Sequence, residues 1–290
     1  MPATHHVENP LEYVLEKLTW TVSDLTRTAG RPRLHAVKSP PAIRRIGAAD
    51  LRDALRQGLA DLGAVRDDVV FIAVIYPLAG LLLAALAFRD DLLPMVFPLA
   101  SGFALIGPLA AVGLYEISRR RERGEAVSWT TAFGVLRSPN LGSILGLGAI
   151  QVLLFFAWLA VAYGVWAATL GPTPPASVGA FLNAVTRTPA GWAMTAVGLG
   201  AGFVFAAVAL AISVISFPML LDRDVSLETA IATSLKAVTQ NPRTMGLWGL
   251  IVAAALVAGS IPALVGLIVV MPVLGHATWH LYRKVVVADD

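Results

Sequence analysis

The residues best suited to chemistry lie near the C-terminus, in the stretch GHATWHLYRK (residues 275–284). His276 and His280 are four residues apart, a spacing that places both side chains on one face of a helix. Histidine is a common ligand of metal ions and of haem iron. A zinc site would need a third ligand, which a carboxylate at another helix end could supply. The carboxylates so placed are Glu116, Asp222 and Asp224.

An interfacial anchor is the competing interpretation of this stretch, and we favour it. Aromatic rings and basic side chains gather where a membrane helix meets the lipid headgroups. The residues of this kind beside the histidines are Trp279, Tyr282, Arg283 and Lys284. Two histidines on one helix face cannot ligate opposite faces of one haem, and the other three histidines all lie within residues 1–47. His276 and His280 are therefore candidate metal ligands only, and we predict no bound cofactor.

Other catalytic arrangements are absent from the sequence. It contains no G-x-S-x-G, H-E-x-x-H or P-loop motif. It also has no cysteine, which excludes disulfides and thiolate sites. Ser213 and Ser216 have no His or Lys on the same helix, and we predict that their hydroxyls bond to helix carbonyls. We predict that the protein is not an enzyme.

Long apolar blocks dominate the chain, which is 57% hydrophobic and 14% charged. A helix needs about 20 apolar residues to cross the hydrocarbon core, and a turn-type cluster at residues 259–262 divides the last block in two. The predicted spans are residues 69–88, 92–117, 141–170, 192–221, 245–259 and 262–282. The expected fold class is all-α, a polytopic membrane protein with six transmembrane helices as three hairpins. The membrane domain would cover residues 48–287, after a partly flexible cytoplasmic segment at residues 1–47.

The distribution of Lys and Arg predicts the orientation of these spans. Of the 22 basic residues, only Arg89 and Arg187 fall on one side of the predicted topology. The positive-inside rule therefore places both termini in the cytoplasm. No apolar block precedes residue 69, so we expect no signal peptide. We predict a multi-pass protein of the bacterial inner membrane that does not bind nucleic acid.

Each predicted hairpin follows a segment with the pattern of an amphipathic helix, at residues 48–68, 126–140 and 224–242. The second and third segments share V-S-x-x-T-A, which makes Ser128 and Ser226 expected N-caps. In the first segment, four leucines recur at helical spacing and should form its apolar face. These are Leu51, Leu55, Leu59 and Leu62.

Two of the spans end alike, in PLAAVGLYEISRR (residues 108–120) and PVLGHATWHLYRK (residues 272–284). With the shared segments, this similarity predicts three internal repeats, an arrangement also found in transporters. Ionisable residues are missing near the centres of the spans, which argues against a proton or sodium pump. Gln151 is the only strongly polar side chain well inside a span. We also expect a short surface helix at residues 176–185.

The sequence resembles a prokaryotic family of predicted integral membrane proteins called domain of unknown function 2189. The resemblance covers about residues 42–287. It rests on the six predicted spans and on three motifs: R-I-x-x-x-D-L (residues 45–51), L-x-x-G-x-x-D-L (residues 55–62) and the closing P-V-L-G-H-A-T-W-H-L-Y-R (residues 272–283). It implies an inner-membrane protein without an established activity. Some relatives carry the label cytochrome c oxidase subunit I. Such a subunit needs histidines on several membrane helices, which this chain lacks.

The leading functional hypothesis is a non-enzymatic permease-like or scaffold protein. One alternative is a metal- or haem-handling membrane protein that uses His276 and His280. Another is a lipid-surface organiser whose amphipathic helices lie on anionic headgroups. The partners expected from the sequence are the bilayer, anionic headgroups at the cytoplasmic face and a second copy of the chain.

Overall fold

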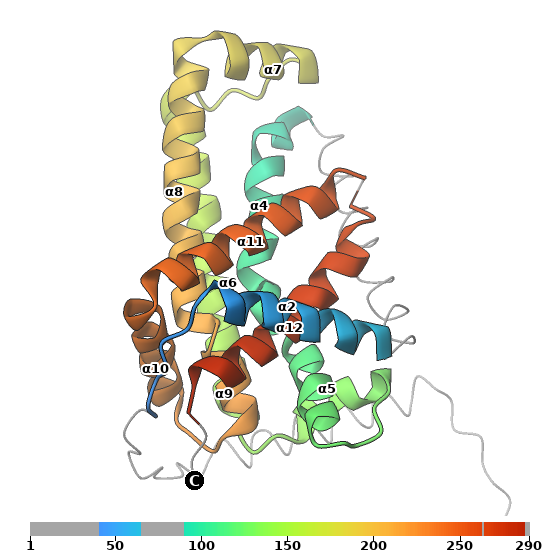
Figure 1. Cartoon of the computed structure of the whole chain (residues 1–290). Helices are drawn as coiled ribbons and strands as arrows, with labels where there is room; N and C mark the ends of the chain where they lie inside the picture. Colours follow the sequence, from blue (N-terminus) through green and yellow to red (C-terminus); the bar gives the residue numbers. More distant parts are fainter. Residues whose placement is uncertain (1–40, 65–89, 263, 288–290) are drawn as a thin grey trace, which may run out of the picture. The chain divides into compact units, whose positions relative to one another are not determined.

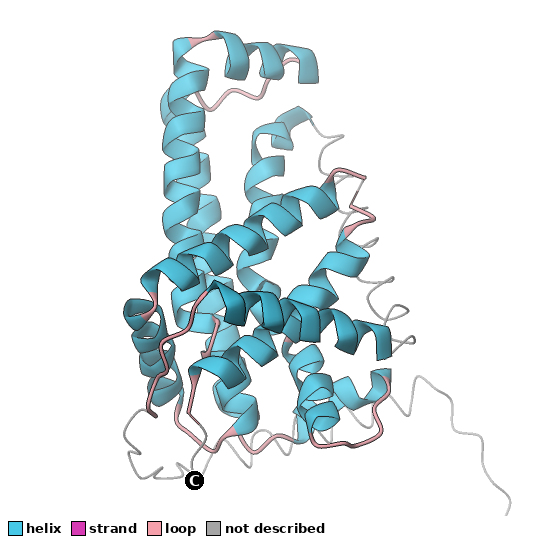
Figure 2. Cartoon of the chain, viewed as in Figure 1, coloured by secondary structure: helices cyan, strands magenta, loops and turns pink. Residues whose placement is uncertain are grey.

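The computed structural model describes residues 41–64, 90–262 and 264–287, and regular structure in these ranges is helical (Figure 2). The predicted all-α class is confirmed for this part of the chain. In chain order the elements are α2 (Ala48–Ala64), η1 (Asp90–Met95), α4 (Val96–Ala110), α5 (Val112–Glu122), η2 (Trp129–Arg137), α6 (Leu141–Thr169), α7 (Val178–Arg187), α8 (Pro189–Ser213), α9 (Ser216–Asp222), α10 (Leu227–Gln240), α11 (Pro242–Ser260) and α12 (Leu267–Val285).

Within the described ranges, four helical stretches are long and apolar enough to cross a bilayer. They are Leu92–Glu122, Leu141–Thr169, Pro189–Asp222 and Pro242–Ser260, and they match four of the predicted spans. The predicted span at residues 69–88 lies outside the described residues. The one at residues 262–282 forms α12, which is not among the four stretches, and its second half carries histidines and basic residues. Six spans in three hairpins therefore remain a prediction.

The predicted break in the last apolar block is confirmed, because α11 ends at Ser260 and α12 begins at Leu267. Two glycines make this turn possible. A Cβ on Gly266 would lie 2.8 Å from the Cα of Gly259, so the two backbones approach too closely for a side chain. Figure 1 shows α11 and α12 as the two arms that leave this turn.

The three predicted amphipathic segments are helical, but not all in the expected way. Ser226 caps α10, and its Oγ accepts a hydrogen bond of 3.2 Å from the Thr229 amide. Ser128 precedes η2, and its amide donates to Thr131 Oγ1 at 3.0 Å. Both predicted N-caps are confirmed. The segment after Ser128 is a 3₁₀ helix rather than an α-helix.

The apolar face predicted from the four leucines coincides only in part with the face of α2 that the structure buries. Leu59 is 58% exposed and only Leu51 of the four is buried. The buried positions are Leu51, Ala54, Gly58 and Asp61. This face is used because α2 packs closely against α12, where a Cβ on Gly58 would lie 2.6 Å from the backbone nitrogen of Ala277. Small side chains allow this approach, and Leu59 turns outward.

The described chain ends are joined beside this helix pair. Ile43 and Val286 form an antiparallel bridge, and the Arg44 amide donates to the Val285 carbonyl at 2.8 Å. Asn241, at the start of α11, accepts a hydrogen bond of 2.9 Å from the Ile46 amide. These contacts fix the start of α2 against the end of α12.

The predicted surface helix corresponds to α7 (Val178–Arg187), in which no residue is buried. Ser177 caps it by accepting a hydrogen bond of 3.1 Å from the Ala180 amide. This prediction is confirmed for the existence of the helix, two residues further along the chain than expected.

Candidate functional site

The polar side chains of interest gather where α5, α9 and α12 end. We call residues 116–123, 222–223 and 279–284, with the adjoining face of α2, the charged end. The apolar helices stop here because their sequences change from long aliphatic runs to Arg, Lys, Asp and Glu. Two polar clusters occupy this region, one around Asp61 and the other around Glu116 and Asp222.

The first cluster contains both predicted metal candidates. His280 Nε2 lies 2.8 Å from Asp61 Oδ2, and His276 Nδ1 lies 2.8 Å from Ser118 Oγ. The Ser118 hydroxyl donates to Asp61 Oδ2 at 2.6 Å. Arg121 donates from Nη1 to Asp61 Oδ1, also at 2.6 Å. Helices α2, α5 and α12 each supply part of this network, so their packing brings it together.

Asp61 is the centre of the first cluster and is buried. Burial opposes its ionisation, but hydrogen bonds from His280 and Ser118, with the charges of His280 and His276, outweigh that effect. Together they hold the pKa of the Asp61 carboxyl below its ordinary value. The ionised carboxylate therefore acts as the common acceptor of the network.

His276 is fully buried, and its two ring nitrogens differ. Because the Ser118 proton points to Asp61, Nδ1 of His276 must carry the proton that it shares with Ser118. Nε2 has no hydrogen-bond partner among the described residues. Trp279 and Tyr282 are also fully buried. The ring of His276 is thus surrounded by protein, whereas His280 is 12% exposed and lines a pocket. The interfacial anchor expected from the sequence stays a prediction.

Two of the three expected third metal ligands, Glu116 and Asp222, lie elsewhere. Glu116 pairs with arginines and Asp222 with Tyr282, so neither meets the histidines. The carboxylate that does is Asp61, which sequence reasoning missed because it lies 219 positions from His280. In the part of the chain that the structure describes, no group of three or more His, Asp or Glu side chains is arranged to hold a metal ion.

Asp61, Ser118 and His276 are also the residue types of a hydrolytic triad. In such a triad the histidine lies between the serine and the carboxylate. Here the serine lies between the histidine and the carboxylate, and its hydroxyl donates to Asp61. Ser118 is 0% exposed, so its oxygen does not face a substrate. The arrangement suits a structural hydrogen-bond chain better than nucleophilic attack.

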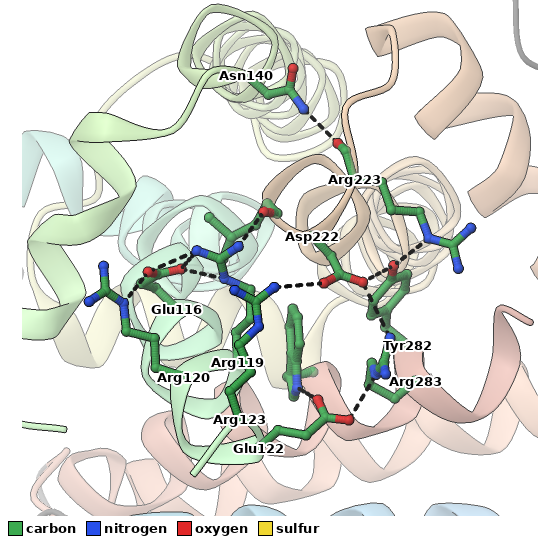
Figure 3. A network of polar contacts seen from close by, with 12 residues as sticks. Glu116, Arg119, Arg120, Glu122, Arg123, Asn140, Asp222, Arg223, Tyr282 and Arg283 are labelled. Carbon is green, nitrogen blue, oxygen red and sulfur yellow. Dashed lines mark hydrogen bonds and ion pairs between the residues drawn. The ribbon is translucent and has the colours of Figure 1, made fainter. Parts of the chain in front are cut away.

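The second cluster begins at Glu116, which is fully buried (Figure 3). Arg119 Nε donates to its Oε2 at 2.7 Å, and Arg120 Nε donates to its Oε1 at 2.7 Å. Arg119 also donates from Nη1 to the Leu221 carbonyl at 3.3 Å. On the far side, a Cβ on Gly134 would lie 3.0 Å from Glu116 Oε1. The sequence places Glu116 at the end of a predicted span, and the structure shows that its side chain is buried beside η2.

Asp222 continues this cluster at the end of α9 (Figure 3). It accepts a hydrogen bond of 2.8 Å from the Tyr282 hydroxyl and one of 3.3 Å from Arg283 Nη1. Arg283 Nε donates to Glu122 at 3.0 Å, and Glu122 also accepts from the Trp279 indole. These bonds connect the ends of α5, α9 and α12.

Asn140 is a further buried polar residue that the sequence did not single out. Its Nδ2 donates to the Leu220 carbonyl at 3.0 Å and to the Arg223 carbonyl at 2.6 Å (Figure 3). It thereby satisfies carbonyls at the end of α9, where a helix leaves its last carbonyls without intrahelical partners. The start of α6 is fixed to the end of α9.

Inside the spans, polar groups behave mostly as predicted. Ser213 donates to the Ala209 carbonyl at 2.6 Å and Ser216 to the Ile212 carbonyl at 2.7 Å, which confirms their back-bonding. Gln151 is fully buried on α6, and neither atom of its amide has a hydrogen-bond partner among the described residues. Its placement inside a span is confirmed, and its surroundings leave the amide unsatisfied.

A pocket of about 480 Å³ opens beside the first cluster. The ionisable residues that line it are Asp61, Arg121, Glu122, His280, Arg283 and Lys284. They come from α2, α5 and α12, so the pocket exists only because these helices meet.

Comparison with known proteins supports the class of the protein. Neither a curated protein nor a solved structure shows significant similarity to the chain. Residues 96–222 match the family described as Predicted integral membrane protein (DUF2189). This range covers α4 to α9, whereas the three motifs that carried the resemblance in the sequence lie outside it. The expected relationship to this family of integral membrane proteins is therefore confirmed, over the central part of the chain.

Proposed function

We propose that this integral membrane protein is a non-enzymatic scaffold of the bacterial inner membrane. The observation that carries the proposal is the use of polar groups at the charged end. Asp61, Glu116, Glu122 and Asp222 each bind side chains from their own or neighbouring helices. Groups bound in this way hold helices together rather than facing a reacting molecule.

The orientation and the repeat pattern belong to the same proposal. With the charged end in the cytoplasm, its arginines and lysines obey the positive-inside rule, and both termini lie on that side. The meeting of α5, α9 and α12 at one end supports three internal repeats, since the last helix of each repeat would then occupy an equivalent place. Six spans as three hairpins complete this arrangement.

The lipid surface is the partner that the proposal names. Apolar side chains remain exposed on the amphipathic elements beside the charged end, with Leu59 on α2, Leu136 on η2 and Leu235 on α10. Such side chains suit the boundary between headgroups and acyl chains. Anionic headgroups at the cytoplasmic face and a second copy of the chain are the expected neighbours.

A permease-like role is the second candidate, and Gln151 favours it. A buried amide without a partner costs free energy at membrane depth, on the order of 1–3 kcal/mol. Because Gln151 is fully buried, a polar solute or water molecule would satisfy that amide only when the helices around α6 move apart. In this case Gln151→Leu would reduce solute flux, whereas Ser213→Ala, which changes a hydroxyl already bonded to its own helix, would not.

Reconstitution separates the two roles. The full chain is placed in liposomes, and the influx of small neutral solutes and of monovalent ions is measured beside protein-free liposomes. Equal rates, together with cross-linked assemblies in native membranes, support the scaffold. Solute influx that Gln151→Leu abolishes, or a robust hydrolytic or redox turnover, would overturn it.

A further inference from the structure

In the pocket at the charged end, the hydrogen-bond acceptors are already bonded, whereas some of the donors are available to a ligand. Its permanently charged lining groups are three cations and two carboxylates. Both oxygens of each carboxylate already accept hydrogen bonds. Asp61 accepts at Oδ1 from Arg121 and at Oδ2 from His280, and Glu122 accepts at Oε1 from Arg283 and at Oε2 from Trp279. A cationic ligand would therefore compete with Arg121 and Arg283 for these carboxylates.

Donors are available in the same pocket. Arg121 makes both of its hydrogen bonds from Nη1, one to Asp61 and one to the Ala60 carbonyl. Its Nε and Nη2 make none within the described part of the chain, and its side chain is 35% exposed. An arginine with a guanidinium edge that is not engaged can donate two parallel hydrogen bonds to an anion. Lys284 adds a second positive charge. Among the described residues its ammonium binds Asp53, an exposed carboxylate that does not line the pocket.

The position of the pocket relative to the membrane indicates which class of anion would bind there. Arg121 lies at the end of the apolar stretch Leu92–Glu122, where a membrane helix passes from hydrocarbon to headgroups. Phosphate groups of lipids are the anions concentrated at that depth. Asp61 and Glu122 on the pocket wall are each paired with an arginine, which lowers the repulsion that these carboxylates exert on an anion.

We propose that this pocket binds the phosphate group of an anionic phospholipid, with Arg121 and Lys284 as its main donors. The proposal rests on the membrane location and the cytoplasmic placement of the charged end given above. Lipid phosphate and free inorganic phosphate share the same chemistry, so the test uses both.

The test counts lipids retained by the full-length protein in native mass spectrometry after purification with phosphatidylglycerol. The wild-type protein should retain one more phosphatidylglycerol molecule than Lys284→Gln or Arg121→Gln does. Its apparent affinity for this lipid should be about tenfold higher than that of either variant. Arg137→Gln is the matched control, because it removes an exposed cation from η2, outside the pocket. This variant should retain lipid as wild type does.

Other outcomes contradict the proposal in distinct ways. Equal retention by wild type and both pocket variants would overturn it. Displacement of the lipid by millimolar inorganic phosphate would make the pocket a site for a free anion rather than for a lipid. If Arg121→Gln loses its fold, Lys284→Gln decides, since it leaves every bond of Asp61 in place. Solute flux in liposomes would contradict the scaffold function but would leave lipid retention unchanged. Failure of the proposed function can therefore be distinguished from failure of the lipid-binding proposal.

Discussion

The carboxylate of Asp61 accepts a hydrogen bond of 2.6 Å from the Ser118 hydroxyl, which lies 57 positions further along the chain. This contact joins α2 to α5, and the bond between Ser118 and His276 extends it to α12. A charged acceptor, a hydroxyl and an imidazole are thus buried together between three helices. Much of the stability at the charged end should depend on this group, because a buried charge that loses its partners is costly.

Asp61→Asn should destabilise the protein by about 3 kcal/mol, since the neutral amide cannot accept the same charge-assisted bonds from Arg121 and His280. The measurement is thermal unfolding of the purified protein in detergent. Asp53→Asn is the control, because Asp53 is an exposed carboxylate of the same helix that pairs with Lys284. Its effect should be much smaller than that of Asp61→Asn, because an exposed ion pair contributes little to stability. Similar losses in both variants would show that burial of Asp61 contributes nothing special.

Acidification should remove the contribution of Asp61 to stability. Its pKa is lower in the folded protein than in the unfolded chain, so the folded state is favoured when the carboxyl is ionised. That stabilisation is present above the unfolded pKa of about 3.9 and is lost as the pH falls through the folded pKa. The difference in unfolding temperature between wild type and Asp61→Asn should therefore be constant near neutral pH and shrink below about pH 4. A difference that grows on acidification would contradict the sign of the shift.

Gly58→Ala should weaken the packing of α2 on α12. The added Cβ would lie 2.6 Å from the backbone nitrogen of Ala277, which cannot move as a flexible side chain could. Overpacking of this kind costs about 1–3 kcal/mol. Gly63→Ala is the matched control on the same helix, because nothing lies within 4 Å of its Cβ position. The control should unfold at the wild-type temperature or slightly above it. If Gly58→Ala unfolds at the same temperature as Gly63→Ala, α2 and α12 are not in the close contact described.

Metal analysis and an optical spectrum of the purified protein test the histidine pair directly. His280 Nε2 and His276 Nδ1 face Asp61 and Ser118, so we expect no stoichiometric metal and no Soret band. His276→Ala/His280→Ala should then change stability but not metal content. Bound metal or haem that disappears in the double variant would restore the metal-handling hypothesis and require the network around Asp61 to rearrange.

The sequence alone determined the features that depend on local composition. Apolar runs of 19 residues or more predict helices that fit the membrane, and four of these lie in the described ranges. Ser128 and Ser226 were recognisable as N-caps because capping involves residues three positions apart. The turn after α11 was equally visible, since Gly259 and Pro262 interrupt an apolar run.

Only the tertiary structure decided which polar groups meet. Glu116, Asp222 and Asp224 were as plausible as partners for the histidines as Asp61, because sequence spacing carries no information across 219 positions. Which face of α2 is buried was also decided by the tertiary structure. Hydrophobic spacing favoured the leucines, but close packing on α12 requires a small residue, and Gly58 supplies it. Backbone proximity between two helices, rather than the periodicity of one, turned Asp61 inward and formed the site.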